Sequence, residues 1–180
     1  MKRLALSIVC VVAVLCAIAF GARSWWSQFI NAPHPTDSIL EARFHQHEAE
    51  FDGLVDMSHA DLKVVRITSD FTWLEHNSAW PRPESELGFS KERWNQYRAL
   101  FKVLGLDGGI LQETGGRVTY LISSASGLAT HSTMKGYAYS MDELSPTAAS
   151  LDKATSSMPQ GHAVVFKKLK NHWYLFYMSA

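Results

Sequence analysis

The chain has 180 residues, which is enough for one ordinary domain and too few for two large ones. Hydrophobic residues make up 47% of it and charged residues 19%, so we expect a packed core and exclude a largely disordered chain. Seventeen basic residues balance seventeen acidic ones, and without a basic surplus we expect no nucleic-acid partner.

The first 23 residues have the pattern of a membrane anchor. Residues 4–22 carry no charge, and at about 1.5 Å per residue a helix of that length spans roughly 28 Å, close to the hydrocarbon core of a bilayer. Basic residues before the segment favour a cytoplasmic N-terminus, and tryptophans after it are typical of the far membrane interface. We therefore predict a single-pass anchor over residues 1–23, with these interface residues: Lys2, Arg3, Arg23, Trp25 and Trp26.

The same segment has two alternative interpretations. Ala17-Ile18-Ala19 fits the small-x-small pattern of a cleavage site, so the segment is a cleaved signal peptide in the first alternative. In the second a cysteine carries a lipid, although neither Cys10 nor Cys16 follows the small residues that such a site needs. All three interpretations export the rest of the chain, to the periplasm if the source is Gram-negative.

The exported part has no cysteine, because both cysteines lie within residues 4–22. A disulfide framework, a cysteine nucleophile and a thiolate zinc site are therefore excluded there. Three basic residues and no acidic ones precede Ser24, so this part has a formal charge of −3. We predict a spacer over residues 24–36, stiffened by Pro33 and Pro35, and one globular domain over residues 37–180.

Two amphipathic helices are predicted in the first half of this domain. The first begins at a capping box of Ser38 and Glu41, with Thr36 and Asp37 as rival caps, and continues to about residue 57. Its apolar positions are Leu40, Phe44, Phe51 and Leu54. The second begins at a Ser90 cap and stops at Gly105. Its apolar stripe is Trp94, Tyr97, Phe101 and Leu104.

Strands dominate the rest of the domain. We predict them over residues 62–68, 71–75 and 134–141, with a hairpin of 110–113 and 117–123 and another of 162–169 and 173–178. Residues 77–88 are a loop, and residues 145–160 are a connection with room for one short helix. The predicted fold is therefore α+β, an antiparallel sheet of about five to seven strands with two helices packed on one face. Strands and helices do not alternate, and no glycine-rich phosphate loop follows a strand, so the pattern does not favour a doubly wound sheet.

Motifs for catalysis or metal binding are weak. Ser132 and Lys135 match an S-x-x-K pattern, but the tyrosines that follow favour a strand, which sends the two side chains to opposite faces. Residues 123–127 lack the first glycine of a nucleophile elbow. His45 and His47 lie on different sides of a helix, where we expect His45 to pair with Glu41 or Glu48 and His47 to lie at the core boundary. We therefore predict no catalytic residue, no metal ligand and no cofactor, leaving open a site assembled from distant segments.

The last strand is apolar on both sides. Trp173, Leu175 and Tyr177 alternate with Tyr174, Phe176 and Met178. One explanation is a central or helix-covered strand. The other is a sheet face left open for a ligand or another protein, since Tyr and Trp bind well at interfaces.

We predict from these features a non-enzymatic, membrane-anchored envelope protein whose exported domain binds another protein or an envelope component. One specific form is an immunity-type inhibitor that neutralises a toxin. The alternatives are a small hydrolase whose Ser and His meet only in three dimensions, and a structural subunit of an envelope complex. The candidate partner-binding residues are Trp80 and Arg82, because Pro81 and Pro83 restrict their loop. A rival interpretation has Trp80 folding back as a loop anchor.

Overall fold

The computed structural model describes residues 33–79, 83–113, 115–127, 132–154 and 163–179. These residues form an α+β fold with one seven-stranded antiparallel sheet, so the predicted fold class is confirmed. The strands lie in the order β2-β1-β3-β4-β5-β7-β6. They are β1 (Val64–Ile67), β2 (Thr72–Leu74), β3 (Gly109–Gln112), β4 (Val118–Ser126), β5 (Thr133–Ser140), β6 (Ala163–Lys170) and β7 (Trp173–Ser179).

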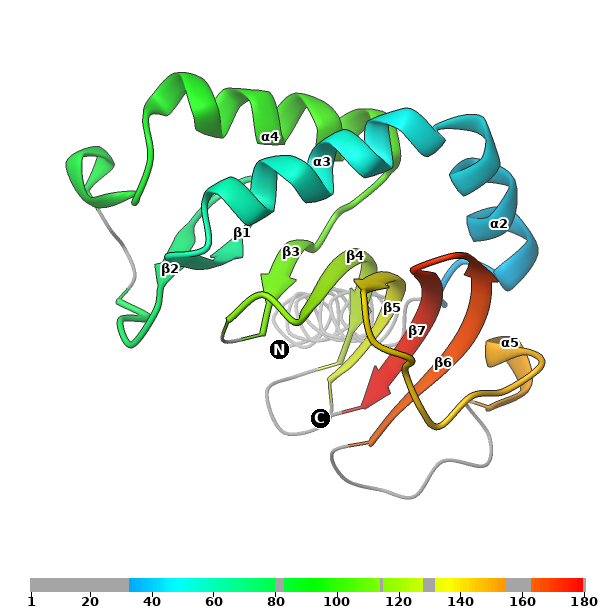
Figure 1. The fold of residues 1–180 in the computed structure, drawn as a ribbon. Helices are drawn as coiled ribbons and strands as arrows, with labels where there is room; N and C mark the ends of the chain where they lie inside the picture. Colours follow the sequence, from blue (N-terminus) through cyan, green and yellow to red (C-terminus); the bar gives the residue numbers. More distant parts are fainter. Residues whose placement is uncertain (1–32, 80–82, 114, 128–131, 155–162, 180) are drawn as a thin grey trace, which may run out of the picture.

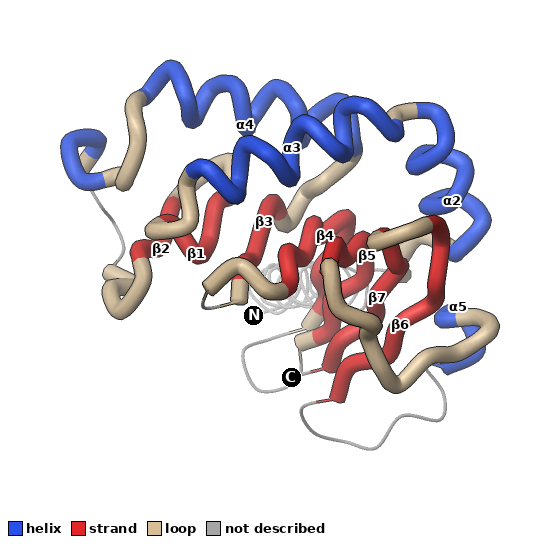
Figure 2. The backbone as a smooth tube through the Cα atoms, viewed as in Figure 1, coloured by secondary structure: helices blue, strands red, loops and turns tan. Residues whose placement is uncertain are grey.

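Three of the helices lie on the same side of this sheet (Figures 1 and 2). They are α2 (Asp37–Gln46), α3 (Glu48–Ala60) and α4 (Lys91–Leu104). The short α5 (Leu151–Ala154) lies beside β6, and a 3₁₀ helix, η1 (Glu84–Glu86), precedes α4. Among the described residues no helix is long and apolar enough to cross a bilayer; the predicted anchor lies outside them.

The α4 helix has the predicted bounds because its signals are local. The Ser90 side chain accepts a hydrogen bond from the Arg93 amide, and Gly105 ends the helix in the left-handed conformation at φ 59°. The four stripe residues are all buried: Trp94, Tyr97, Phe101 and Leu104.

The prediction of one helix over residues 38–57 is wrong, because the chain breaks at His47. His47 has φ −131° and ψ 31°, outside the helical region, and its amide makes the last bonds of α2, to the carbonyls of Arg43 and Phe44. The bend lets Phe44 on α2 and Phe51 on α3 meet at 5.4 Å between ring centroids. The sheet is therefore covered by three helices rather than two.

The predicted capping box is also absent. The N-cap of α2 is Thr36, one of the two rival caps and two residues before Ser38, and its side chain makes no capping hydrogen bond. Glu41 forms an ion pair with Lys167 on β6 at 2.6 Å, so its carboxylate is directed to the sheet. Ser38 contacts the Thr36 hydroxyl at 3.0 Å. Glu41 therefore forms a tertiary ion pair with Lys167 instead of the predicted local cap.

Both predicted hairpins are present. The β3–β4 pair and the β6–β7 pair are antiparallel, and Asn171 occupies the second turn at φ 47°. The outer edge of β6 is partly covered by residues 146–148. There the Ala148 amide donates to the Phe166 carbonyl at 2.8 Å, and the Phe166 amide donates to the Pro146 carbonyl at 3.0 Å.

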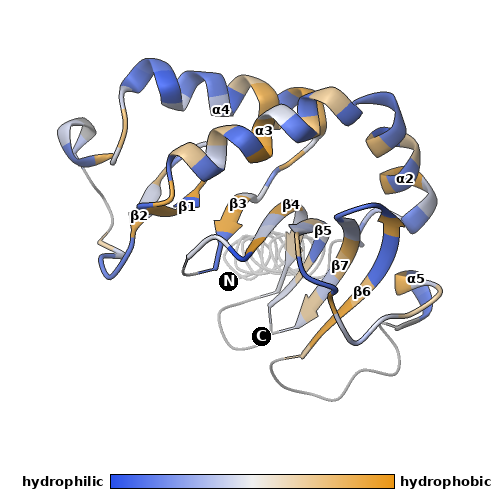
Figure 3. Ribbon diagram, viewed as in Figure 1, coloured by the Kyte–Doolittle hydropathy of each residue, from blue (hydrophilic) through white to orange (hydrophobic). Residues whose placement is uncertain are grey.

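The sheet buries apolar side chains on both faces, and hydrophobic residues run through β3, β7 and the first part of β6 as well as through parts of α2 and α3 (Figure 3). The main core lies between the sheet and the three helices, with Tyr97 and Tyr137 at its centre. The other face carries a separate group, which we name the second-face cluster. Its buried members are Val118, Tyr120, Ile122, Ala138, Phe166, Tyr174 and Phe176.

Candidate functional site

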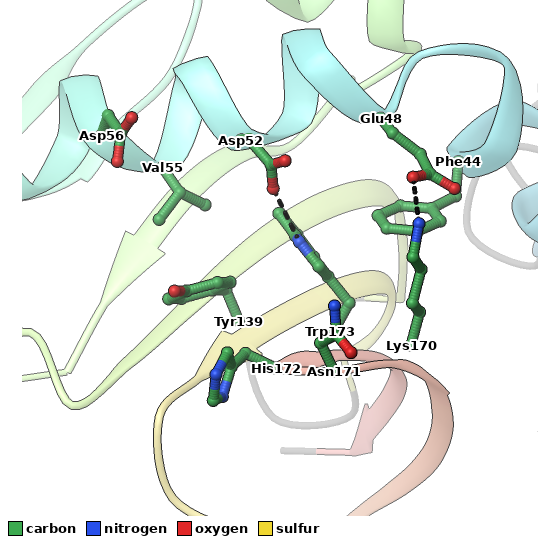
Figure 4. A pocket seen from close by; sticks show the side chains of 10 residues that line it. All are labelled: Phe44, Glu48, Asp52, Val55, Asp56, Tyr139, Lys170, Asn171, His172 and Trp173. Carbon is green, nitrogen blue, oxygen red and sulfur yellow. Dashed lines mark hydrogen bonds and ion pairs between the residues drawn. The ribbon is translucent and has the colours of Figure 1, made fainter.

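A cavity of about 290 Å³ lies between α3 and the turn that joins β6 to β7 (Figure 4). This volume is near the lower end of the range for small-ligand sites. One wall comes from α3, the opposite wall comes from the turn, and aromatic rings lie between them. Because α3 begins only after the break at His47, the bend described above fixes where this wall stands.

The α3 wall is acidic. Glu48, Asp52 and Asp56 are four residues apart, so a helix places them on one face. Lys170 Nζ lies 2.5 Å from Glu48 Oε2, and its hydrogen bond, followed by that of His45, lowers the pKa of Glu48. The Asp56 carboxylate forms no hydrogen bond or ion pair within the part of the chain that the structure describes.

Aromatic side chains form the base of the cavity. The Trp173 ring is 5.2 Å from both Phe44 and Tyr139, measured between centroids. Its Nε1 donates a hydrogen bond to Asp52 Oδ1 at 3.0 Å, which holds that carboxylate against the base of the cavity (Figure 4). The Tyr139 ring also lies 5.9 Å from His172. Electron-rich ring faces attract cations, as carboxylates do.

The arrangement therefore suits a cationic group. Lys170 is the one lysine that lines the cavity, and Glu48 already neutralises it. Asp52 and Asp56 leave the α3 wall with a surplus of negative charge, beside rings that also favour a positive ligand.

This cavity was not predicted. Its residues come from two regions that are more than eighty residues apart, and their meeting depends on how α3 crosses the sheet. The one sequence signal was the spacing of Glu48, Asp52 and Asp56 on the polar side of the predicted helix.

A second polar cluster surrounds His34, just before α2. His34 Nδ1 lies 2.7 Å from the Ser124 hydroxyl, and His34 Nε2 lies 2.8 Å from the Thr133 hydroxyl. Its ring packs edge-on against Tyr177 at 5.6 Å. Burial, and then the positive charge of Lys135, lower the pKa of His34. The neutral imidazole therefore links the start of the domain to β4, β5 and β7.

This cluster brings together a Ser and a His, as the hydrolase alternative requires. The second ring nitrogen of His34, however, contacts the Thr133 hydroxyl rather than a carboxylate. A carboxylate partner is what orients the base in a catalytic triad. The acidic cavity is lined by other residues.

Lys135 is buried in a structural ion network. Its Nζ lies 2.9 Å from Asp37 Oδ1 and 2.5 Å from Asp152 Oδ1, and its side chain is 2% exposed. Asp37 also accepts the Leu151 amide at 2.8 Å. Burial opposes the ionisation of Asp37, but Lys135, the Leu151 amide and Lys167 outweigh it, so the pKa of Asp37 is lowered.

The network explains the S-x-x-K match. Residues 133–140 form β5, as the predicted strand requires, and Lys135 is held by two carboxylates. Through these two ion pairs Lys135 joins α2, β5 and α5, which gives the lysine of the match a structural role.

The predicted site residues fall outside the described part of the chain. They are Lys2, Arg3, Arg23, Trp25, Trp26, Trp80 and Arg82. The predicted pair of His45 with Glu48 is present at 3.0 Å, and His47 is half-buried at the helix break. No three His, Cys, Asp or Glu side chains among the described residues converge as metal ligands.

Comparison of the chain with protein-family models, with curated proteins and with solved structures gave no match.

Proposed function

We propose that this chain is a membrane-anchored envelope protein whose exported domain binds a cationic group of another protein or envelope component in the cavity beside α3. The observation that supports this function is the acidic wall of Asp52 and Asp56 facing the rings of Tyr139 and Trp173. A lysine, arginine or amine head presented by a partner has the charge and size for such a site.

Binding suits this site better than catalysis. Glu48 is paired with Lys170 and Asp52 with the Trp173 indole, so these carboxylates are held as fixed charges. In an immunity-type inhibitor the cavity would receive a basic side chain of a toxin, and the mild negative charge of the domain would assist the encounter.

The anchor is part of this proposal. Residues 1–23 would hold the domain at the membrane, with Lys2 and Arg3 on the cytoplasmic side. A reporter enzyme fused after Ala180 should be active only in the exported compartment. Activity of the same fusion in the cytoplasm would contradict the proposed topology.

The ligand class can be tested with defined probes. Short peptides with a single central Lys, Arg, Glu or Gln are titrated against the full chain in detergent, with two-dimensional NMR or tryptophan fluorescence as the readout. We expect saturable binding of the Lys and Arg peptides alone. Asp56→Asn should weaken it, because the variant removes a carboxylate that has no partner among the residues that the structure describes.

Asp107→Asn is the matched control, since it removes the same charge from an exposed loop between α4 and β3. Equal weakening by both variants would show a general charge effect rather than a site. Binding of the Glu peptide with the same affinity as the Lys peptide would contradict the proposed ligand class.

The 2.7 Å contact between Ser124 and His34 supports one second candidate, a hydrolase. The hydrolase candidate requires that the purified chain turns over a chromogenic ester or amide, and that Ser124→Ala loses this turnover. Turnover that survives this substitution would exclude Ser124 as the nucleophile.

A further inference from the structure

One end of the cavity beside α3 already holds a cation that belongs to the chain itself. Glu48, Asp52 and Asp56 follow one another along the cavity wall at intervals of about one helical turn. Lys170 reaches across from the end of β6, and its Nζ lies 2.5 Å from Glu48 Oε2 (Figure 4). The first of the three carboxylates is therefore occupied by a lysine ammonium, which is the kind of group that the proposed function assigns to the ligand.

A shift of strand register accompanies the orientation of Lys170 towards this wall. Residues two apart on a regular strand point to the same face of the sheet. Lys168 and Lys170 point to opposite faces, and the register of β6 against β7 shifts between them, as at a β-bulge. Lys168 Nζ donates to the hydroxyl of Tyr174 in the second-face cluster, whereas Lys170 contacts Glu48 on the helix-covered face. The irregular strand thus gives the cavity a lysine that a regular strand would place on the other face.

The other two carboxylates differ in what they already bind. Asp52 Oδ1 accepts the hydrogen bond from the Trp173 indole at 3.0 Å. Asp56, at the far end of the wall from Glu48, has no hydrogen bond or ion pair among the residues that the structure describes. Like charges repel, so a cationic ligand is directed away from Lys170 and towards Asp56. The wall therefore has one open place for a cation although it carries three carboxylates.

Without Lys170 the wall would have two open places. The other oxygen of Glu48, Oε1, lies 3.0 Å from His45 Nδ1, so loss of the lysine frees Oε2 alone. The eight residues from Glu48 to Asp56 correspond to about 12 Å along a helix. Two lysines four positions apart in an extended peptide lie on the same side, about 13 Å from each other. One such peptide would then reach both carboxylates.

We propose that Lys170 limits the cavity to a single cationic group of the ligand. This inference rests on the proposed function and adds its specificity: the partner presents one lysine, arginine or amine, and a second positive charge about 12 Å away finds no place on the wall. Lys170 is a specificity-determining residue in this sense, because its ammonium occupies Glu48 and repels a second cation there.

Peptides of equal charge and different spacing test the inference. One short peptide has two adjacent lysines, another has two lysines four positions apart, and a third has one lysine. Each is titrated against the full chain in detergent at about pH 8, where histidines are ordinarily neutral, and two-dimensional NMR gives the Kd. Wild type should bind the two dibasic peptides equally. Lys170→Met should bind the spaced peptide up to about fivefold more tightly than the adjacent one, the gain that one partly exposed charge pair gives.

Lys168→Met is the matched control, because it removes the same charge from the same strand and leaves Lys170 on Glu48. It should show no preference for the spaced peptide. Lys170→Gln replaces Lys170→Met if near-UV circular dichroism shows that the latter does not fold.

Several results would overturn the inference. A preference for the spaced peptide in wild type, in both variants or in neither variant would contradict it, while binding of the single-lysine peptide to wild type would still support the proposed function. Weaker binding of every peptide by Lys170→Met would make the Lys170–Glu48 pair a structural support of the cavity. If wild type binds the single-lysine peptide no better than the same peptide with Gln, the proposed function and this inference both fail.

Discussion

The Trp173 indole donates a 3.0 Å hydrogen bond to the Asp52 carboxylate and so ties the start of β7 to the middle of α3. Trp173 is 4% exposed, so its N–H has little access to water as an alternative partner. The same bond sets the position of one acidic group of the proposed binding site. Stability and the proposed ligand recognition therefore share this residue pair.

Asp52→Ala should destabilise the domain. The substitution leaves a buried N–H without a partner, which costs about 1–3 kcal/mol of unfolding free energy. Urea denaturation of the full chain in detergent measures the loss. Asp56→Ala is the control on the same helix, and it should change stability little because Asp56 has no bond to lose among the described residues. An equal loss in both variants would mean that the indole bond is not the cause.

Lys135→Met should be among the most damaging substitutions in the domain. It removes the closer of the two cations beside Asp37, which is 4% exposed, and leaves only Lys167 at 3.4 Å; breaking a buried pair costs about 3–5 kcal/mol. The melting temperature is the measurement. Arg117→Ala, which removes an ion pair with Asp142 on the surface, should cost less than about 1 kcal/mol. Similar melting of the two variants would contradict the structural role of the network.

Stability should fall as the solution becomes acidic, and His34 predicts where this begins. The pKa of His34 is lowered in the folded state, so the unfolded chain binds the proton more readily. The unfolding free energy therefore decreases as pH falls through about 6.5, the ordinary histidine value, towards the lowered folded value. Unfolding free energies measured across this range should show a weaker slope for His34→Gln.

Asp37 affects the unfolding free energy in a separate, more acidic pH range. Its pKa is lowered in the fold, so its contribution to the unfolding free energy is lost as pH falls below the ordinary value of 3.8.

The His34 prediction has its own contradicting outcome. If the unfolding free energy changes with pH near neutrality by the same amount in wild type and in His34→Gln, another histidine causes the change.

Phe101→Ala tests the packing of α4. Phe101 is 5% exposed and belongs to the main core, so truncation to Ala should cost about 3–5 kcal/mol. Val103→Ala on the same helix is the control, because that side chain is 51% exposed. Calorimetric melting of the two variants should differ clearly, and equal melting would contradict the inward orientation of Phe101.

Local signals made parts of the fold predictable. The α4 helix has its cap, its apolar stripe and its terminal glycine within sixteen residues, and each of these signals acts on neighbouring backbone. The β3–β4 and β6–β7 hairpins likewise depend on short turns. The break at His47 was not predictable in the same way, because Phe44 and Phe51 both fit one continuous helical pattern. Both rings meet Trp173 on the sheet, a tertiary contact that the helical spacing does not encode.

Local signals of this kind could not predict most of the candidate site. Asp52 and Trp173 are 121 positions apart, and His34 and Thr133 are 99 apart, so neither pair has a spacing that a motif search can recognise. Charge and aromatic character were visible in the sequence, but the partner of each group was set by the strand order. Only Glu48 and His45, three residues apart, were predicted as a pair.

The covering of β6 by residues 146–148 affects how many copies of this protein can share a surface. An open strand edge is a template on which a neighbouring chain can add its own strand. Here the Phe166 amide and carbonyl are already bonded, and Lys168 places a positive charge farther along the same strand. Two domains that approach edge to edge would meet blocked hydrogen-bonding groups and like charges. Two copies would therefore not join their sheets through the β6 edge.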